Sequence, residues 1–218
     1  MELPKRKNIR KKGYDYSQNG CYFITICTYK RECIFGDVVD GVMQLNEYGE
    51  IVKRELLLTE EKRPYGMFDN YAIMPNHVHI LITLFHDREQ TLEEAYMLSL
   101  TDTARRVPTG GQFGEPTEES IPTIIRSFKS ASTNVIRRFV GTRRAVSDEP
   151  HTTPDLHTIS NGFTEIYAVW QGRYHDNIIR SERSYQNIFQ YISNNPAQWE
   201  SDCHNPANPK YNKWEDRP

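Results

Sequence analysis

The sequence predicts an α+β fold of the ferredoxin-like kind: a split β-α-β sandwich with an antiparallel central sheet and helices packed on it. Two observations support this prediction. Strand-like and helix-like segments follow one another in the order strand, helix, strands, helix, strand, helix. Signals for a doubly wound parallel sheet are weak. In such a fold, we expect the strongest strand segment, in the middle of the chain, to be central.

The strand predictions rest on aromatic and β-branched residues bounded by turn signals. Residues 21–28 follow the turn-like Ser-Gln-Asn-Gly of 17–20 and should form a buried strand. Residues 42–45 suggest a short strand, and 65–84 should contain a second and a third long strand. Residues 165–170 are expected to form a further short strand.

Three helices are predicted from apolar residues that recur at spacings of three and four. Asn46 should cap a helix that runs to about Lys62. A second helix should begin near Ser120 and stop at Gly141. The last should run from about Ser181 and end by Asn195, because Pro196 follows.

Length and composition fit a single domain over residues 1–218, since 218 residues with 37% apolar content can form a sizeable core. The domain should carry a basic N-terminal arm (1–13), an inserted excursion (about 86–118) and a C-terminal extension (197–218). The N-terminus lacks the apolar stretch of a secretory signal, and no apolar run could span a bilayer. We therefore expect a cytoplasmic protein without a membrane partner.

The net charge of −2 conceals two clusters of basic residues. One lies in the N-terminal arm and the other in and after the second predicted helix. A flexible tail and a solvated helix face explain them as well as DNA binding does. The candidate phosphate-binding residues are Lys5, Arg6, Lys7, Arg10, Lys11, Lys12, Arg126, Lys129, Arg137 and Arg138.

Two histidines, His77 and His79, flank Val78 within the most strand-like segment of the chain. Because side chains alternate between the two faces of a strand, both imidazoles should project from the same face. They would then offer two neutral nitrogen donors to one metal ion. Histidines in the core or on the surface remain an alternative interpretation of the pair.

The last predicted helix carries Tyr191 and Asn195, which are four residues apart and so lie on one side of it. If Asn195 completes a metal site through its amide oxygen, Tyr191 lies one turn away. A phenol beside a metal-bound phosphate can attack phosphorus. The alternatives are a tyrosine at the edge of the core and a helix C-cap ahead of proline. No residue is an evident general base for the tyrosine, whose ordinary pKa is near 10.

Several blocks of the sequence resemble the single-tyrosine, His-hydrophobic-His (HUH) transposases of the insertion-sequence type, in particular the branch associated with repetitive extragenic palindromes. Together they span most of the chain. The blocks are 9–18 with 22–28, 74–79, 124–131, 169–171 with 178–180, and 191–196 with Trp199.

The resemblance implies that His77 and His79 bind a divalent metal, Mg²⁺ or Mn²⁺, with Asn195 as the third ligand and Tyr191 as the nucleophile. It implies cleavage and rejoining of single-stranded DNA beside a hairpin through a 5′-phosphotyrosine. The basic residues would bind phosphates. The candidate stacking surfaces are Tyr14, Tyr16, Phe128, Trp170 and Tyr174, and for each of them a place in the core is the alternative. The resemblance favours a nucleoid-associated monomer and leaves a dimer open. The stretch Tyr174–Asn177 departs from the family pattern, so the resemblance itself carries no role over to Tyr174 or His175.

Three function classes therefore remain after the sequence is read. The preferred one is a DNA-cleaving and rejoining enzyme with a tyrosine nucleophile. The second is a non-catalytic nucleic-acid-binding module of ferredoxin-like fold. The third is a metallohydrolase that uses His77 and His79 with water as the nucleophile.

Overall fold

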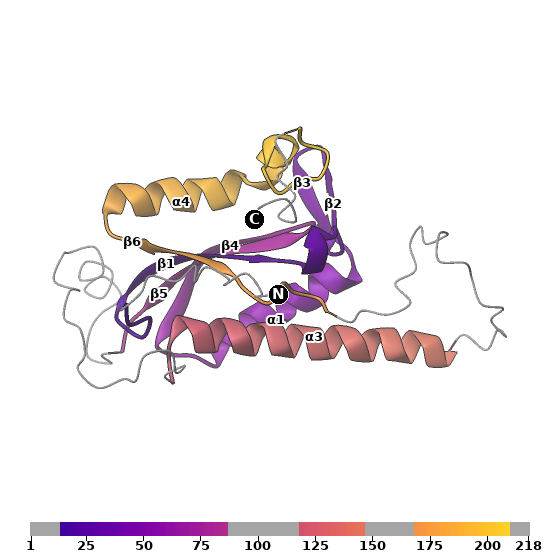
Figure 1. Ribbon diagram of the computed structural model, residues 1–218, viewed down its shortest axis with the longest axis horizontal. Coiled ribbons are helices and arrows are strands. Elements are labelled where there is room, and N and C mark those ends of the chain that lie inside the picture. The colour runs from indigo at the N-terminus through magenta and orange to yellow at the C-terminus, as the bar shows by residue number, and fades with distance from the viewer. Residues whose placement is uncertain (1–13, 87–117, 147–167, 210–218) are drawn as a thin grey trace, which may run out of the picture.

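The computed structural model describes residues 14–86, 118–146 and 168–209. Its centre is a four-stranded antiparallel sheet in the order β4-β5-β1-β6 (Figure 1). β5 is paired along its whole length with β1 on one side and with β4 on the other. The strands are β1 (Gly20–Cys27), β4 (Gly66–Met74), β5 (His77–Leu84) and β6 (His175–Ile179).

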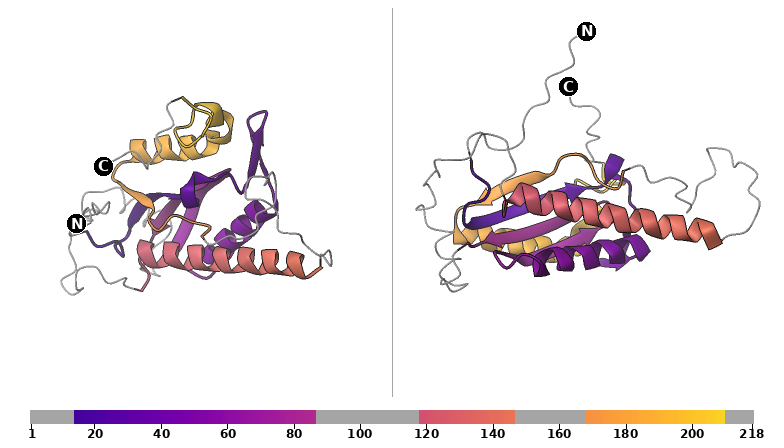
Figure 2. Two further views of the ribbon diagram at one scale, coloured as in Figure 1. Left: turned by 45° about the vertical axis from the view of Figure 1, so that its right-hand side comes forward. Right: turned by 90° about the horizontal axis from the view of Figure 1, so that it is seen from below.

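Helices cover both faces of this sheet. Figures 1 and 2 show α1 (Glu47–Glu61) and α3 (Ile121–Val146) together on one face, with α4 (Glu182–Asn194) on the other. α1 joins β1 to β4, α3 joins β5 to β6, and each connection skips one strand. This is the split β-α-β arrangement of a ferredoxin-like fold. The predicted fold class is confirmed.

The helix starts follow from capping chemistry. The Asn46 side chain accepts hydrogen bonds from the backbone N–H groups of Tyr48 and Gly49 at 3.0 Å. The Ser181 hydroxyl accepts from the N–H of Ser184 at 3.3 Å. Both caps satisfy donors that the first turn of a helix leaves unpaired. The predicted starts of α1 and α4 are thus confirmed.

The prediction of a strand at 165–170 is wrong for the residues that the structure describes there. Of residues 168–170, Trp170 makes an isolated bridge with Thr28, and the fourth strand of the sheet is β6 at His175–Ile179. β6 lies at the edge of the sheet and is only partly buried, so it tolerates polar residues in its first half. The apolar run at 165–170 therefore gave the stronger but misleading strand signal.

Two further details differ from the sequence predictions. A short strand β2 (Gly36–Val39) precedes β3 (Val42–Leu45), and the two form a hairpin through Asp40 and Gly41, both of positive φ. α3 continues past Gly141 to Val146. The stop at Gly141 was wrong because a glycine is tolerated inside an exposed helix at a cost of about 1 kcal/mol.

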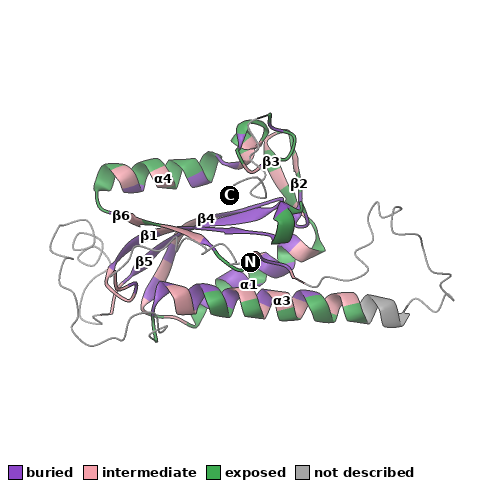
Figure 3. Cartoon of the chain, viewed as in Figure 1, coloured by how far each residue is buried: buried purple, intermediate pink, exposed green. Residues whose placement is uncertain are grey.

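The core has two separate parts, one on each face of the sheet. The larger lies between the sheet and α1 and α3, and includes Ile24, Val78, Ile80 and Phe128. The smaller lies under α4 and includes Met74, Leu81 and Ile192. In Figure 3 the central strands are buried while α4 is largely exposed on its outer side.

Parts of the predicted domain organisation lie outside the described residues. These parts are the basic arm, most of the inserted excursion and the end of the C-terminal extension. The extension is described to residue 209 and begins with the short helix η3 (Pro196–Ser201). Within the described ranges, none of the helices combines the length and the apolar character that crossing a bilayer requires.

Candidate metal centre and tyrosine

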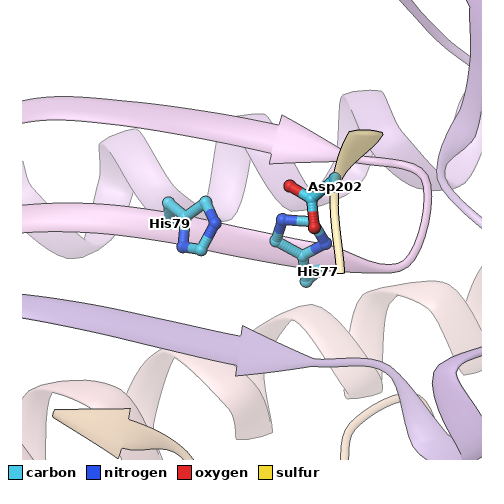
Figure 4. A group of neighbouring side chains, drawn as sticks. All are labelled: His77, His79 and Asp202. Atoms are coloured by element: carbon cyan, nitrogen blue, oxygen red, sulfur yellow. The ribbon is translucent and has the colours of Figure 1, made fainter. Parts of the chain in front are cut away.

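β5 places His77 and His79 on the face of the sheet that α4 covers. Val78 and Ile80, which alternate with them, belong to the core on the opposite face. Both histidines are buried, and their ring centroids lie 4.5 Å apart (Figure 4). Two imidazoles are therefore held side by side on the central part of the sheet.

Each histidine is oriented by a buried polar neighbour that sequence reasoning missed. The Nδ1 of His77 donates to Asn76 Oδ1 at 2.9 Å, and the Nδ1 of His79 lies 2.9 Å from Thr25 Oγ1. Thr25 is the partner of His79 across the β1–β5 ladder. These contacts leave each Nε2 directed into the site, as the outer hydrogen bonds of metal-bound histidines do.

Both imidazoles are neutral at physiological pH. Burial, together with the neighbouring His79 and His204, lowers the pKa of His77 well below 6.5. Burial lowers the pKa of His79 to about 3. Because a protonated imidazole cannot ligate a metal, these low pKa values keep both nitrogens available as ligands.

α4 packs on β4 and β5 (Figure 1), and the ring centroid of its Tyr191 lies 5.2 Å from that of His79. The Tyr191 hydroxyl lies 3.3 Å from Nε2 of His79, and its ring is edge-on to Phe23. α4 thus covers the face of the sheet that bears the histidines. Tyr191 remains 38% exposed, so this residue is both next to the histidines and open to solvent on part of its surface.

Asn195 follows the last turn of α4 and is only 1% exposed. Its Nδ2 donates to Asp202 Oδ2 at 2.8 Å, while its Oδ1 and the Nε2 of His77 are buried without a hydrogen bond of acceptable geometry. Asn195 is nevertheless close enough to affect the pKa values of both His77 and Tyr191. The amide oxygen is thus presented to the histidines rather than used elsewhere.

Asp202 and His204 also reach the site, and sequence analysis did not single them out. A carboxylate oxygen of Asp202 and one ring nitrogen each of His77 and His79 all lie within 4.8 Å of one another (Figure 4). The ring of His204 lies 4.4 Å from that of His77. Both follow η3, in a segment of turns whose sequence has no periodicity that would place it against β5.

The residues present fit a divalent cation. Three buried polar atoms near one another lack hydrogen-bond partners among the described residues: Nε2 of His77, Nε2 of His204 and Oδ1 of Asn195. An unpaired polar atom in the interior costs free energy, which a bound cation would recover. Imidazole nitrogen with carboxylate or amide oxygen is an intermediate donor set that suits Mn²⁺.

The phenol of Tyr191 is protonated in this environment. Burial, and then the negative charge of Asp202, raise its pKa above the ordinary value of 10. Its hydroxyl lies 3.3 Å from the Nε2 of His79, which faces the site, and among the described residues no carboxylate is placed as an obvious base for it. Activation of this phenol requires a nearby positive charge.

The predicted DNA-binding residues are not gathered at this site. Those of the N-terminal arm lie outside the described residues. Arg126, Lys129, Arg137 and Arg138 lie on α3, across the sheet from Tyr191 (Figure 1). The three arginines are exposed, and the Lys129 ammonium donates to backbone carbonyl oxygens of residues 171 and 172.

Four of the five aromatic residues considered for base stacking are buried in the core. Tyr16, Phe128, Trp170 and Tyr174 are each less than 9% exposed, so none presents an open ring face. Tyr14 is half-buried in edge-on contact with the Tyr16 ring. Their packing explains them without nucleic acid.

Comparisons with known proteins give a sequence relative and distant structural likenesses. No protein-family model matches the chain. Among solved structures, it is similar to a REP-associated tyrosine transposase bound to a REP hairpin, with a TM-score of 0.46 and 14% identity over 91% of this chain and 74% of that one. It is also similar to a candidate transposase of Deinococcus radiodurans, with a TM-score of 0.38 and 17% identity over 85% of this chain and 95% of that one.

Both TM-scores are low, so the fold assignment above rests on strand order and register. The sequence relative is an uncharacterized protein of Haemophilus influenzae strain Rd. The two share 34% identity over 197 residues, which cover 90% of this chain and 91% of the relative. The chain therefore belongs to the same protein family as this Haemophilus influenzae protein.

Proposed function

We propose that this chain is a metal-dependent single-stranded DNA endonuclease and strand transferase of the transposase type, acting at hairpins through a 5′-phosphotyrosine on Tyr191. One observation carries the proposal. The Tyr191 hydroxyl lies 3.3 Å from the Nε2 of His79, beside the buried and unpaired Nε2 of His77 and Oδ1 of Asn195. A nucleophile and a set of metal ligands thus share one small region.

The reaction is an in-line displacement at a DNA phosphate. The oxygen of Tyr191 forms a bond to phosphorus, the bond from phosphorus to the 3′ oxygen breaks, and the 3′ oxygen takes a proton to leave as a hydroxyl. The phenol proton is lost to water. The phosphotyrosine keeps the energy of a phosphodiester, so attack by a free 3′ hydroxyl reverses the step and joins strands.

His77, His79 and Asn195 would hold the cation. When bound, it would lower the pKa of the phenol, offset the charge that develops on the phosphate and orient the phosphate for displacement. Burial keeps the histidines neutral, and the contacts with Asn76 and Thr25 aim them inward. The 38% exposure of Tyr191 leaves a side from which a single strand can approach.

The basic face of α3 would bind phosphates away from the reacting bond. Arg126, Arg137 and Arg138 are on the other side of the sheet from Tyr191, so DNA that contacts both must pass around an edge of the sheet. A hairpin followed by a flexible single strand has the shape for this path. The N-terminal arm is proposed to add further phosphate contacts.

A covalent-adduct assay tests the proposal. The full chain is mixed with Mn²⁺ and labelled single-stranded hairpin DNA, and the protein is run on a denaturing gel. We expect an adduct with the natural chain and its complete loss in Tyr191→Phe and His77→Ala. Tyr71→Phe is the matched control because it removes a hydroxyl from the opposite face, where Tyr71 packs on the larger core.

The alternative function classes predict other results. Cleavage that survives Tyr191→Phe but fails in His77→Ala would identify a metallohydrolase with water as the nucleophile. DNA binding without cleavage or adduct in any variant would identify a non-catalytic binding module. Either result would overturn the tyrosine mechanism.

A further inference from the structure

We propose that Asp202 is a direct ligand of the metal, completing a centre with His77 and His79. The proposal rests on the metal-dependent function inferred above and deepens it, because a carboxylate changes the charge of the centre. Asp202 lies after α4, beyond the proposed ligand Asn195, in the turns that follow η3.

Distance and burial support this assignment. Ligand atoms of His77, His79 and Asp202 all lie within 4.8 Å of one another, and Asp202 is 7% exposed (Figure 4). A second observation points to a ligand at the same place. The Nε2 of His77, a residue of this group, is fully buried and unpaired.

Charge is the reason that a carboxylate is needed. His77, His79 and Asn195 are all neutral and nearly inaccessible to solvent. Moving a divalent cation out of water into a neutral, buried set of ligands carries a large desolvation cost, which a negative ligand offsets. The positive Arg31 adds to that cost, since it is close enough to lower the pKa of His77.

The segment around Asp202 holds its carboxylate in place. Oδ1 accepts from the backbone N–H of His204 at 2.6 Å, and Oδ2 accepts from Asn195 Nδ2 at 2.8 Å. The Asp202 carbonyl oxygen accepts from Asn208 Nδ2 at 2.9 Å. The side chain of Cys203 also hydrogen-bonds to this carboxylate. An ionised carboxylate has about four lone-pair sites, so a site remains for a cation. The carboxylate is therefore preorganised and still able to ligate.

One alternative uses the same contacts differently. The hydrogen bond from Asn195 Nδ2 to Asp202 turns the amide oxygen toward the histidines. Asp202 could act through this bond alone, as a positioning residue for Asn195. The two roles predict different metal affinities when Asn195 is absent. Loss of a ligand still weakens metal binding, whereas loss of a residue that only positions Asn195 has no further effect.

The test is Mn²⁺ binding by the full chain without DNA, measured by calorimetry and by the EPR signal of free Mn²⁺. Four proteins form a cycle: natural, Asp202→Asn, Asn195→Ala and the double variant. We expect Asp202→Asn to weaken binding by about tenfold or more in both backgrounds. Glu200→Gln, which removes an exposed charge two residues away, should change affinity by less than about twofold.

Each other result overturns the proposal in a distinct way. An effect of Asp202→Asn that disappears in the Asn195→Ala background overturns the ligand role and assigns positioning instead. Unchanged binding in Asp202→Asn, with normal binding by the natural chain, overturns only this proposal. No binding by the natural chain overturns the metal centre itself, and with it the proposed function.

Asp202→Asn can also fail by unfolding, which thermal melting in chelator detects. Asp202→Glu then replaces it, because glutamate keeps the charge but moves the carboxylate. We expect Asp202→Glu to retain Mn²⁺ with an altered EPR spectrum of the bound ion. A bound-ion spectrum identical to that of the natural chain overturns the ligand role.

Discussion

The two faces of β5 show how one strand serves two purposes. Toward α1 and α3 it presents four buried aliphatic side chains: Val78, Ile80, Ile82 and Leu84. Toward α4 it presents His77, His79, Leu81 and Thr83, of which three are polar and all are buried. The first face is an ordinary hydrophobic core, while the second places polar side chains in the protein interior.

This difference explains where the candidate site can exist. Buried polar groups cost free energy unless they are paired, and Asn76 and Thr25 pair only one nitrogen of each histidine. The aliphatic face supplies the stability that allows the other face to keep the unpaired Nε2 of His77. β5 is thus divided between a stabilising face toward α1 and α3 and a reactive face toward α4, and substitutions on each face test this division.

The largest effect on stability is expected on the aliphatic face. Ile80→Ala should lower the free energy of unfolding by about 2–5 kcal/mol, because it leaves a cavity in the middle of the sheet. Urea unfolding measures the change in free energy. The control is Val39→Ala at an exposed position, which should change the free energy of unfolding by no more than about 0.5 kcal/mol. Mn²⁺ affinity of the folded variant should be unchanged. A loss of less than 1 kcal/mol, or weakened Mn²⁺ binding, would contradict the division.

An intermediate effect is expected at the turn before β5. Asn76 is fully buried; its Nδ2 donates to the carbonyl oxygens of Arg31 and His204, and its Oδ1 accepts from His77. Asn76→Ala should cost about 1–3 kcal/mol, because it leaves these partners unpaired. It should also weaken Mn²⁺ binding, unlike Ile80→Ala. Loss of stability with unchanged affinity would show that Asn76 does not orient His77.

The smallest effect is a gain in stability on the reactive face. Burial raises the pKa of Asp69 from 3.8 to about 6, although Thr83 donates to its Oδ2 at 2.6 Å. The folded protein thus holds a proton that the unfolded chain releases, and stability is lost as the pH rises through about 6. Asp69→Asn removes this loss and should stabilise the protein by about 1 kcal/mol at pH 8.

The gain in Asp69→Asn should disappear near pH 4, where the folded carboxyl is already protonated. Thermal unfolding at the two pH values measures the difference. Asp37→Asn, which removes an exposed carboxylate, is the control substitution. An equal gain at both pH values would mean that packing, and not ionisation, is responsible.

Much of the fold could be predicted because its signals are local. The caps at Asn46 and Ser181 and the alternation along β5 each depend on a few neighbouring residues. β6 was missed because an edge strand needs few apolar residues. The end of α3 was misplaced because the glycine at 141 lies on an exposed side, where nothing forbids it.

Only those residues of the site that lie on a regular strand or helix could be predicted. His77, His79 and Tyr191 lie on a strand and a helix whose periodicity fixes the direction of their side chains. Asp202 and His204 lie in turns after Pro196, where direction depends on tertiary hydrogen bonds. No pattern in the sequence around them distinguishes them from surface residues.

The pairing of Met74 with His77 across a two-residue turn has a consequence for how the site could change over generations. A register slip of one residue at this hairpin would exchange the two faces of β5 and turn both imidazoles into the aliphatic core. Insertions or deletions in this hairpin cannot shift the two histidines by small steps. Either both imidazoles stay on the face covered by α4 or both leave it. Diversity among relatives should therefore accumulate in the turns after Pro196, where a ligand can be moved, replaced or lost while the sheet stays intact.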